Sequence, residues 1–129
     1  MWPFVRGKAR VRWVWAALDT DTRQVVAMAV GDRSEDTARR PWAAVPPAYR
    51  DRAIICTDFW SADLAVVPVE RHAAGGKEAG LTCHVERFWS TARQRCPRLM
   101  RTSLPFSKCV ESHVGALWYF LRHDNSSLL

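Results

Sequence analysis

The chain has 129 residues, 48% of them hydrophobic and 25% charged, which predicts one soluble globular domain over residues 1–129. Its formal net charge of +6 favours an anionic partner, nucleic acid before a membrane surface. No apolar run approaches the ~18 residues of a membrane-spanning helix, and the N-terminus does not resemble a secretory signal, so we expect a cytoplasmic protein without a membrane partner.

The first half of the chain has the pattern of strands followed by a helix. VRWVWAAL at 11–18 and QVVAMAV at 24–30 favour two strands, and the polar turn DTDTR between them predicts a hairpin. After Gly31 a helix is expected, with Ser34 as its N-cap. Pro41 is expected to break or kink this helix, because proline lacks the amide donor.

The middle of the chain contains one strand between less regular segments. PPAYRDR, at 46–52, is predicted to be a loop, and AIICTD at 53–58 a short strand buried on both faces. FWSADLAVV, at 59–67, suggests a short helix, and HAAGGKEAGLT at 72–82 a flexible loop. Such a buried strand is typical of the middle of a mixed sheet covered by helices.

Two helices are predicted near the C-terminus. The first runs over 83–96 and ends at Pro97, and the second runs from about 107 to 123. One apolar face of the second helix recurs with helical spacing at Val110, Val114, Leu117, Trp118 and Leu121. The order of elements favours a layered α/β domain rather than a helical bundle.

The tryptophans and cysteines give two further expectations. Most of the seven tryptophans are expected in the core, because they lie in apolar runs. The four cysteines form no C-x-x-C pair and are expected to be free thiols. A zinc site is the alternative, although its spacing fits no common zinc module; it would use Cys83, Cys96, Cys109 and His113.

Two carboxylates are candidates for a functional site. Asp58 ends a predicted buried strand, where α/β sheets bind ligands, or it caps the helix that follows. Glu86 lies on a basic helix, where Arg93 and Gln94 fall near the same face. Glutamate can hold a cation while arginine contacts phosphate oxygens. The alternative is a solvated helix with Glu–Arg ion pairs, which the helix by itself favours.

Four segments carry a resemblance that covers almost the whole chain. They are GKARVRWVWAALDTDTRQVVAMAVGDRSEDTARR, TDFW, GKEAGLTCHVERFWSTARQRCPRLMR and LPFSKCVESHVGALWYFLRHDN. Together they resemble the C-terminal catalytic half of insertion-sequence-1 family transposases, which are DDE-type enzymes. The resemblance implies an RNase H-like fold: a mixed sheet that opens with three antiparallel strands and is flanked by helices, truncated here at the first strand.

The resemblance also implies a function and a site. The family's metal-dependent DNA strand cleavage and transfer uses an Asp, Asp, Glu triad, in which Asp58 matches the second Asp and Glu86 the Glu. The triad holds two Mg²⁺ or Mn²⁺ ions, hard cations that prefer oxygen ligands. The arginine-rich helix implies contacts with the DNA backbone, from Arg87, Arg93, Gln94, Arg95 and Arg98.

The implied partners are the insertion-sequence ends and the target DNA, with a homo-oligomer or a full-length transposase as a further partner. The implied location is the bacterial or archaeal cytoplasm, at the nucleoid.

This chain departs from the family pattern at its start. The family's first triad Asp lies just before the segment that matches MWPFV, and the chain begins at Met1. Asp19 is a poor substitute, because it ends the neighbouring strand. We therefore expect a truncated copy with impaired activity; the alternative is a catalytically dead, DNA-binding or dominant-negative remnant. His84 is near Glu86, but packing or exposure is the expected role of the histidines.

Overall fold

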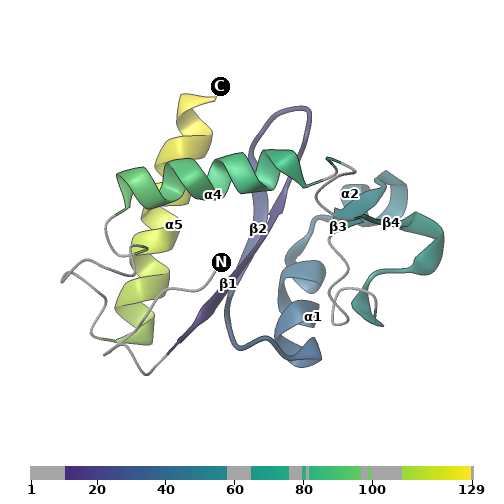
Figure 1. Ribbon diagram of the computed structural model, residues 1–129, viewed down its shortest axis with the longest axis horizontal. Coiled ribbons are helices and arrows are strands. Elements are labelled where there is room, and N and C mark those ends of the chain that lie inside the picture. The colour runs from purple at the N-terminus through teal and green to yellow at the C-terminus, as the bar shows by residue number, and fades with distance from the viewer. Residues whose placement is uncertain are drawn as a thin grey trace.

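The computed structural model describes residues 11–57, 65–75, 80, 82–96, 99 and 109–128. These residues form a mixed α/β structure (Figure 1). Its strands and main helices are, in chain order, β1 (Trp13–Leu18), β2 (Val25–Gly31), α1 (Glu35–Ala44), α2 (Pro47–Arg52), β3 (Ile55–Thr57), β4 (His72–Ala74), α4 (Cys83–Arg95) and α5 (Val110–Ser127). A single 3-10 turn, Val69–Arg71, leads into β4.

The predicted hairpin is confirmed. β1 and β2 pair antiparallel from Trp13 opposite Gly31 to Leu18 opposite Val25, with an irregularity in the register beside Leu18. Arg23 closes the turn in the left-handed region, at φ 67°, and its amide donates to the Asp19 carbonyl at 2.8 Å. This local pairing brings the two strands together without a long loop.

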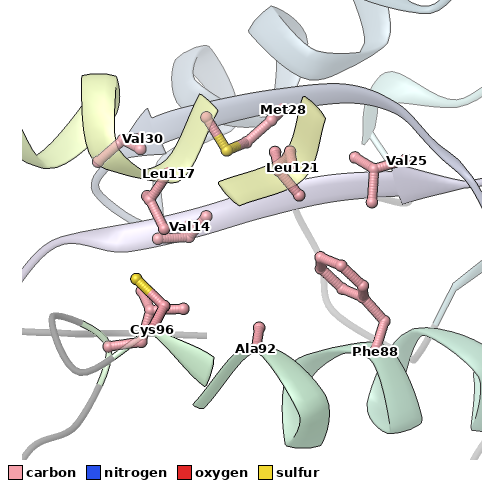
Figure 2. Close-up of a cluster of buried hydrophobic side chains, with 10 residues drawn as sticks. Val14, Val25, Met28, Val30, Phe88, Ala92, Cys96, Leu117 and Leu121 are labelled. Atoms are coloured by element: carbon pink, nitrogen blue, oxygen red, sulfur yellow. The ribbon is translucent and has the colours of Figure 1, made fainter. Parts of the chain in front are cut away.

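The main core lies between this hairpin and the helices α4 and α5. Figure 2 shows Leu117 and Leu121 of α5, and Phe88 of α4, directed toward the strands. The buried members of this cluster are Val14, Val25, Met28, Val30, Phe88, Ala92, Cys96, Leu99, Leu117 and Leu121. Burying these apolar side chains stabilises the fold by removing their surface from water.

Helix α1 covers the opposite face of the hairpin (Figure 1). Because side chains alternate along a strand, Ala27 and Ala29 of β2 face away from Met28, and both are buried. Ser34 caps α1 as predicted, since its hydroxyl accepts from the Thr37 amide at 3.2 Å.

The sequence predicted that Pro41 breaks or kinks α1, and the break is wrong. The helix continues through Pro41 to Ala44, and the Pro41 carbonyl still accepts from the Val45 amide at 3.0 Å. Only the hydrogen bond that the proline amide would have donated is lost, and burial of the proline ring offsets this loss.

The segment from 46 to 75 contains the largest differences from the sequence predictions. PPAYRDR was expected to be a loop but forms α2, because Pro47 occupies the first helical position, where proline is tolerated. The predicted loop at 72–82 begins with β4, which pairs parallel with β3. β3 itself was expected to be buried on both faces, but Cys56 is exposed, and Ile54, which lies just before the strand, is 64% exposed.

The two C-terminal helices agree with the predictions apart from the limits of α5. α4 ends one residue before Cys96, as expected from Pro97. α5 begins at Val110 and continues to Ser127, so it extends beyond the predicted end. The extra turn is anchored by Asn125: its side-chain amide accepts from the Val25 amide at 2.9 Å and donates to the Val25 carbonyl at 3.0 Å.

The expectation that most tryptophans are core residues is wrong for those described, of which only Trp89 packs against the core cluster. Trp13, Trp15, Trp42 and Trp89 are half-buried, and Trp118 is 40% exposed. Trp118 was placed on the apolar face of the last helix, yet it lies beside that face. Rings of this size are rarely buried completely in a domain with small cores.

The cysteines Cys56, Cys83, Cys96 and Cys109 are free thiols, as predicted. All four residues of the alternative zinc site are described, and no three His, Cys, Asp or Glu of the described ranges lie close enough to hold a metal ion. The zinc alternative is therefore not supported. None of the helices in the described ranges has the length and apolar character needed to cross a membrane.

Candidate functional site

A pocket of about 260 Å³ lies where β1 and β3 end. Its walls come from β1, α1, β3 and the first turn of α4. Most of the lining is apolar, and its polar side chains are Asp19, Thr20, Tyr49, Thr57, Thr82 and His84. Asp58 lies outside the described residues, but it follows Thr57 directly in the chain. The described lining of the pocket therefore includes the residue that precedes the predicted catalytic carboxylate in the chain.

Asp19 lines this pocket, although its carboxylate already has several donors. It accepts from the Asp21 amide at 2.9 Å, from the Thr22 hydroxyl at 3.0 Å and from the Tyr49 hydroxyl at 2.8 Å. The Asp21 amide, followed by Tyr49, lowers the pKa of Asp19, and the same contact raises the pKa of Tyr49. Asp19 thus stabilises the hairpin turn and ties it to α2.

A second polar contact lies at the end of β3. Thr57 Oγ1 and His72 Nε2 share a hydrogen bond of 2.5 Å, and His72 belongs to β4. The Gly75 amide also donates to the Thr57 carbonyl, at 3.1 Å. These contacts hold Thr57 to His72 of β4 and to Gly75, which follows β4.

Glu86 lies in the first turn of α4 and is exposed. Its carboxylate accepts a long hydrogen bond from the Thr82 hydroxyl, at 3.5 Å. It forms no ion pair with any arginine in the described part of the chain, including Arg87, Arg93 and Arg95. The interpretation of Glu86 as an intrahelical ion-pair partner is therefore wrong for the described arginines, and its oxygens are accessible to a cation.

The basic residues of α4 divide into two groups. Arg87, Arg93 and Gln94 are exposed, and with 3.6 residues per turn Arg93 falls on the side of Glu86. Arg95 is also exposed, but its guanidinium pairs with Asp124 of α5, with N and O 3.3 Å apart. Arg95 therefore links two helices, a role that the sequence did not suggest. Arg98 lies outside the described residues.

His84 contacts the hairpin rather than Glu86. Its Nδ1 accepts a hydrogen bond from Arg23 Nη1, because a guanidinium only donates. This contact joins the β1–β2 turn to the first turn of α4. The sequence prediction that packing or exposure explains the histidines holds for His113, which is fully buried, and for His123, which is exposed.

Sequence reasoning missed several residues that line the pocket. Tyr49, Thr57 and Thr82 come from three separate segments, and only Thr57 and Thr82 lie in the segments that carry the family resemblance. Tyr49 could not be identified because its segment was expected to be a loop. Only the fold brings these side chains together.

Comparison with known proteins decides the family. The model of the family described as "IS1 transposase" matches residues 1–125. The chain belongs to the IS1 transposase family. Its sequence is similar to an insertion element iso-IS1n protein InsB from Shigella dysenteriae, with 33% identity over 93% of this chain and 88% of that protein. No solved structure matches the chain.

Two other relatives within the IS1 transposase family give the same result. The insertion element IS1 protein InsB of Shigella sonnei is 32% identical over 93% of this chain and 88% of its own length. The insertion element IS1 4 protein InsB of Escherichia coli K12 is 32% identical over 93% of this chain and 69% of its own length. The resemblance predicted from the four sequence segments is thereby confirmed.

Proposed function

We propose that this chain is a catalytic domain for metal-dependent DNA strand cleavage and transfer, with Asp58 and Glu86 as ligands of Mg²⁺ or Mn²⁺. Membership of the IS1 transposase family is the observation that carries the proposal. Three features of the structure support it: the arrangement of the strands, the accessible Glu86 carboxylate and the basic outer face of α4.

The arrangement of the strands supports an RNase H-like fold. An antiparallel hairpin comes first and a parallel pair later, and helices cover both faces of the hairpin. β1 and β3 line the same pocket, although they belong to separate sheets in the described residues. One further strand between them would join the two pairs into a single mixed sheet, which is the arrangement the fold requires.

The chemistry of the donors fits a hard divalent cation. Glu86 is exposed and has no competing ion pair among the described residues, and Asp58 would add a second carboxylate beside the pocket. Carboxylate oxygens are the ligands that such cations prefer. Bound ions would activate the attacking oxygen and stabilise the leaving oxygen of the phosphodiester.

In this proposal the contribution of the protein is positioning. The contact between Thr57 and His72 holds the end of β3, and the contact between Arg23 and His84 holds the start of α4.

The outer face of α4 supports contact with DNA. Arg87, Arg93 and Gln94 are exposed beside Glu86, and the chain carries a net charge of +6. Guanidinium groups pair with phosphate oxygens in a bidentate geometry. On this proposal the arginines align a phosphate next to the carboxylates that hold the metal ions. Arg95 and Arg98 are further proposed contacts. Arg95 would have to contact a DNA phosphate while it also pairs with Asp124.

Calorimetric titration of the chain with Mn²⁺ tests the metal site. Glu86→Gln and Asp58→Asn should each weaken binding by at least tenfold, because a charged ligand is lost in each case. Asp36→Asn is the matched control, since Asp36 is an exposed carboxylate in the first turn of another helix. Equal affinity in the Glu86 variant and the wild-type chain would contradict the metal site.

The salt dependence of DNA binding tests the basic face. Arg87→Gln and Arg93→Gln should each reduce affinity for duplex DNA of any sequence and lower the slope of log K against log salt by about 0.9. Arg52→Gln, an exposed arginine at the end of α2, should leave the slope unchanged. DNA binding that persists while Mn²⁺ binding is absent would favour the alternative function, a DNA-binding remnant without catalysis.

A further inference from the structure

The outer face of α5 carries exposed residues that the proposed function does not use. Trp118 is 40% exposed and Tyr119 is 76% exposed, although both are large aromatic side chains. Glu111, Gly115 and Arg122 on the same helix are exposed as well. Figure 1 shows α5 on the side of the hairpin opposite to α1, and Figure 2 shows its buried Leu117 and Leu121 directed toward the strands.

Four of these residues form one stripe along α5. Gly115 lies four positions after Glu111, Trp118 three positions after Gly115, and Arg122 four positions after Trp118. Spacings of four, three and four residues keep side chains on one side of a helix. The stripe therefore runs from an acidic end, through a glycine and a tryptophan, to a basic end.

The stripe is self-complementary when two copies of α5 pack antiparallel. Glu111 lies as far before Gly115 as Arg122 lies after Trp118. In an antiparallel pair of such helices, Glu111 of one copy faces Arg122 of the other, and Gly115 of one faces Trp118 of the other. A two-fold axis midway between Gly115 and Trp118 makes both contacts twice, as an isologous interface requires.

The charges cannot pair with each other within one chain. At 1.5 Å per residue, Glu111 and Arg122 lie about 16 Å apart along the helix axis. Neither side chain forms an ion pair with another residue that the structure describes. A reversed second copy supplies the opposite charge at both ends of the stripe, which gives orientation to the pairing.

Gly115 gives the stripe its shape. A Cβ atom added at this position would meet nothing within 4 Å, so packing inside the chain does not require glycine there. Glycine is also less favourable than alanine inside a helix. Close approach by a neighbouring helix explains the glycine, because the partner's Trp118 ring then packs directly against the backbone at Gly115.

We infer that α5 is a homodimer interface, in which a second copy of this chain packs antiparallel on the stripe Glu111, Gly115, Trp118 and Arg122. The inference is independent of the metal and DNA contacts of the proposed function. One helix pair buries less surface than the ~1,200–2,000 Å² of stable complexes, so the dimer should dissociate in the micromolar range.

Sedimentation equilibrium of the full chain over micromolar concentrations tests the inference. The wild-type chain should dimerise, and Trp118→Ala should raise the dissociation constant by at least tenfold, since buried tryptophans dominate such interfaces. Glu111→Arg and Arg122→Glu should each weaken the dimer by about tenfold, because like charges then face each other. Combining both reversals should restore the affinity to within about threefold.

Two further variants separate association from folding. Gly115→Gln should raise the melting temperature of the monomer, through better helix propensity, while it weakens the dimer. His123→Glu is the control for Arg122→Glu, since it is exposed on the next position of α5 and lies off the stripe.

Three results would overturn the inference. The first is a wild-type chain that stays monomeric throughout the series. The second is a dimer whose affinity the single reversals leave unchanged. The third is loss of DNA binding by Arg122→Glu without any change in association, which would assign this face to DNA.

Discussion

The two strand pairs in the described part of the chain differ in length, direction and in how well helices cover them. The β1–β2 hairpin pairs antiparallel from Trp13 to Leu18, with α4 and α5 on one face and α1 on the other. β3 and β4 pair in parallel over three positions, and both Cys56 within the pairing and Ile54 just before it are exposed. β1 and β3 both end at the pocket, so one of its walls belongs to the well-covered sheet and another to the less covered one.

The buried core that stabilises the fold therefore lies in a different region from β3, which lines the pocket. The buried cluster stabilises the hairpin and its helices. Among the described residues, few buried side chains pack near β3. Segments with few buried contacts open locally at lower free energy than the core. Substitutions in the two regions should therefore have unequal effects on the free energy of unfolding.

The largest effect is expected from the core of the hairpin region. Leu117 of α5 is 1% exposed, so Leu117→Ala should lower the free energy of unfolding by about 2–5 kcal/mol. Ile54→Ala, at a position that is 64% exposed beside β3, should change it by less than about 0.5 kcal/mol. Urea unfolding measures both, and similar losses for the two variants would contradict the comparison.

A smaller effect is expected from the link between α5 and β2. Asn125→Ala leaves the Val25 amide and carbonyl without their partner, which should cost about 1–3 kcal/mol. Ser126→Ala removes only a hydroxyl that donates within α5, so it should cost less in the same urea titration. If the two variants unfolded at the same urea concentration, Asn125 would have no special role in closing the hairpin region.

Ser34 lies at the start of α1, on the other face of the hairpin. Ser34→Ala removes the acceptor of the Thr37 amide and should cost about 0.5–2 kcal/mol. Ser34→Thr keeps an acceptor at the cap and should recover most of this loss in thermal unfolding. An alanine variant as stable as the threonine variant would show that the cap contributes little to this face.

The smallest expected effect is the change in folding stability at acid pH that comes from Asp32, beside the Ser34 cap. Hydrogen bonds from Ser34 and then Thr37 lower the pKa of Asp32 from 3.8 to about 2. The unfolded chain therefore takes up this proton first as the pH falls. The stabilisation by Asp32 is present above about 3.8 and is lost as the pH falls toward about 2. Asp32→Asn should flatten the stability profile in this window, and an unchanged profile would contradict the assignment.

The sequence predicted well the elements that depend on local pattern. The hairpin followed from alternation around a polar turn, the α1 cap from Ser34, and the end of α4 from Pro97. Each of these signals lies within a few residues of the feature that it determines. The family resemblance also rested on continuous segments, and the comparison confirmed it.

The sequence failed where contacts between distant segments decide the structure. β4 has only three residues, and its parallel pairing with β3 leaves no periodic pattern to recognise. Trp118 fitted the apolar spacing of α5, but it is 40% exposed and lies outside the core. Tyr49 lines the pocket from α2. The sequence did not predict this helix because the segment begins with two prolines. The assignments of Asp58 and Glu86 stay predictions.

A double-mutant cycle on Mn²⁺ affinity tests most directly whether Asp58 and Glu86 form one metal site. Two ligands of a shared ion act as a unit, so Asp58→Asn combined with Glu86→Gln should weaken binding little more than either single substitution. Wild-type affinity in the double variant, or losses that add independently, would contradict a shared site.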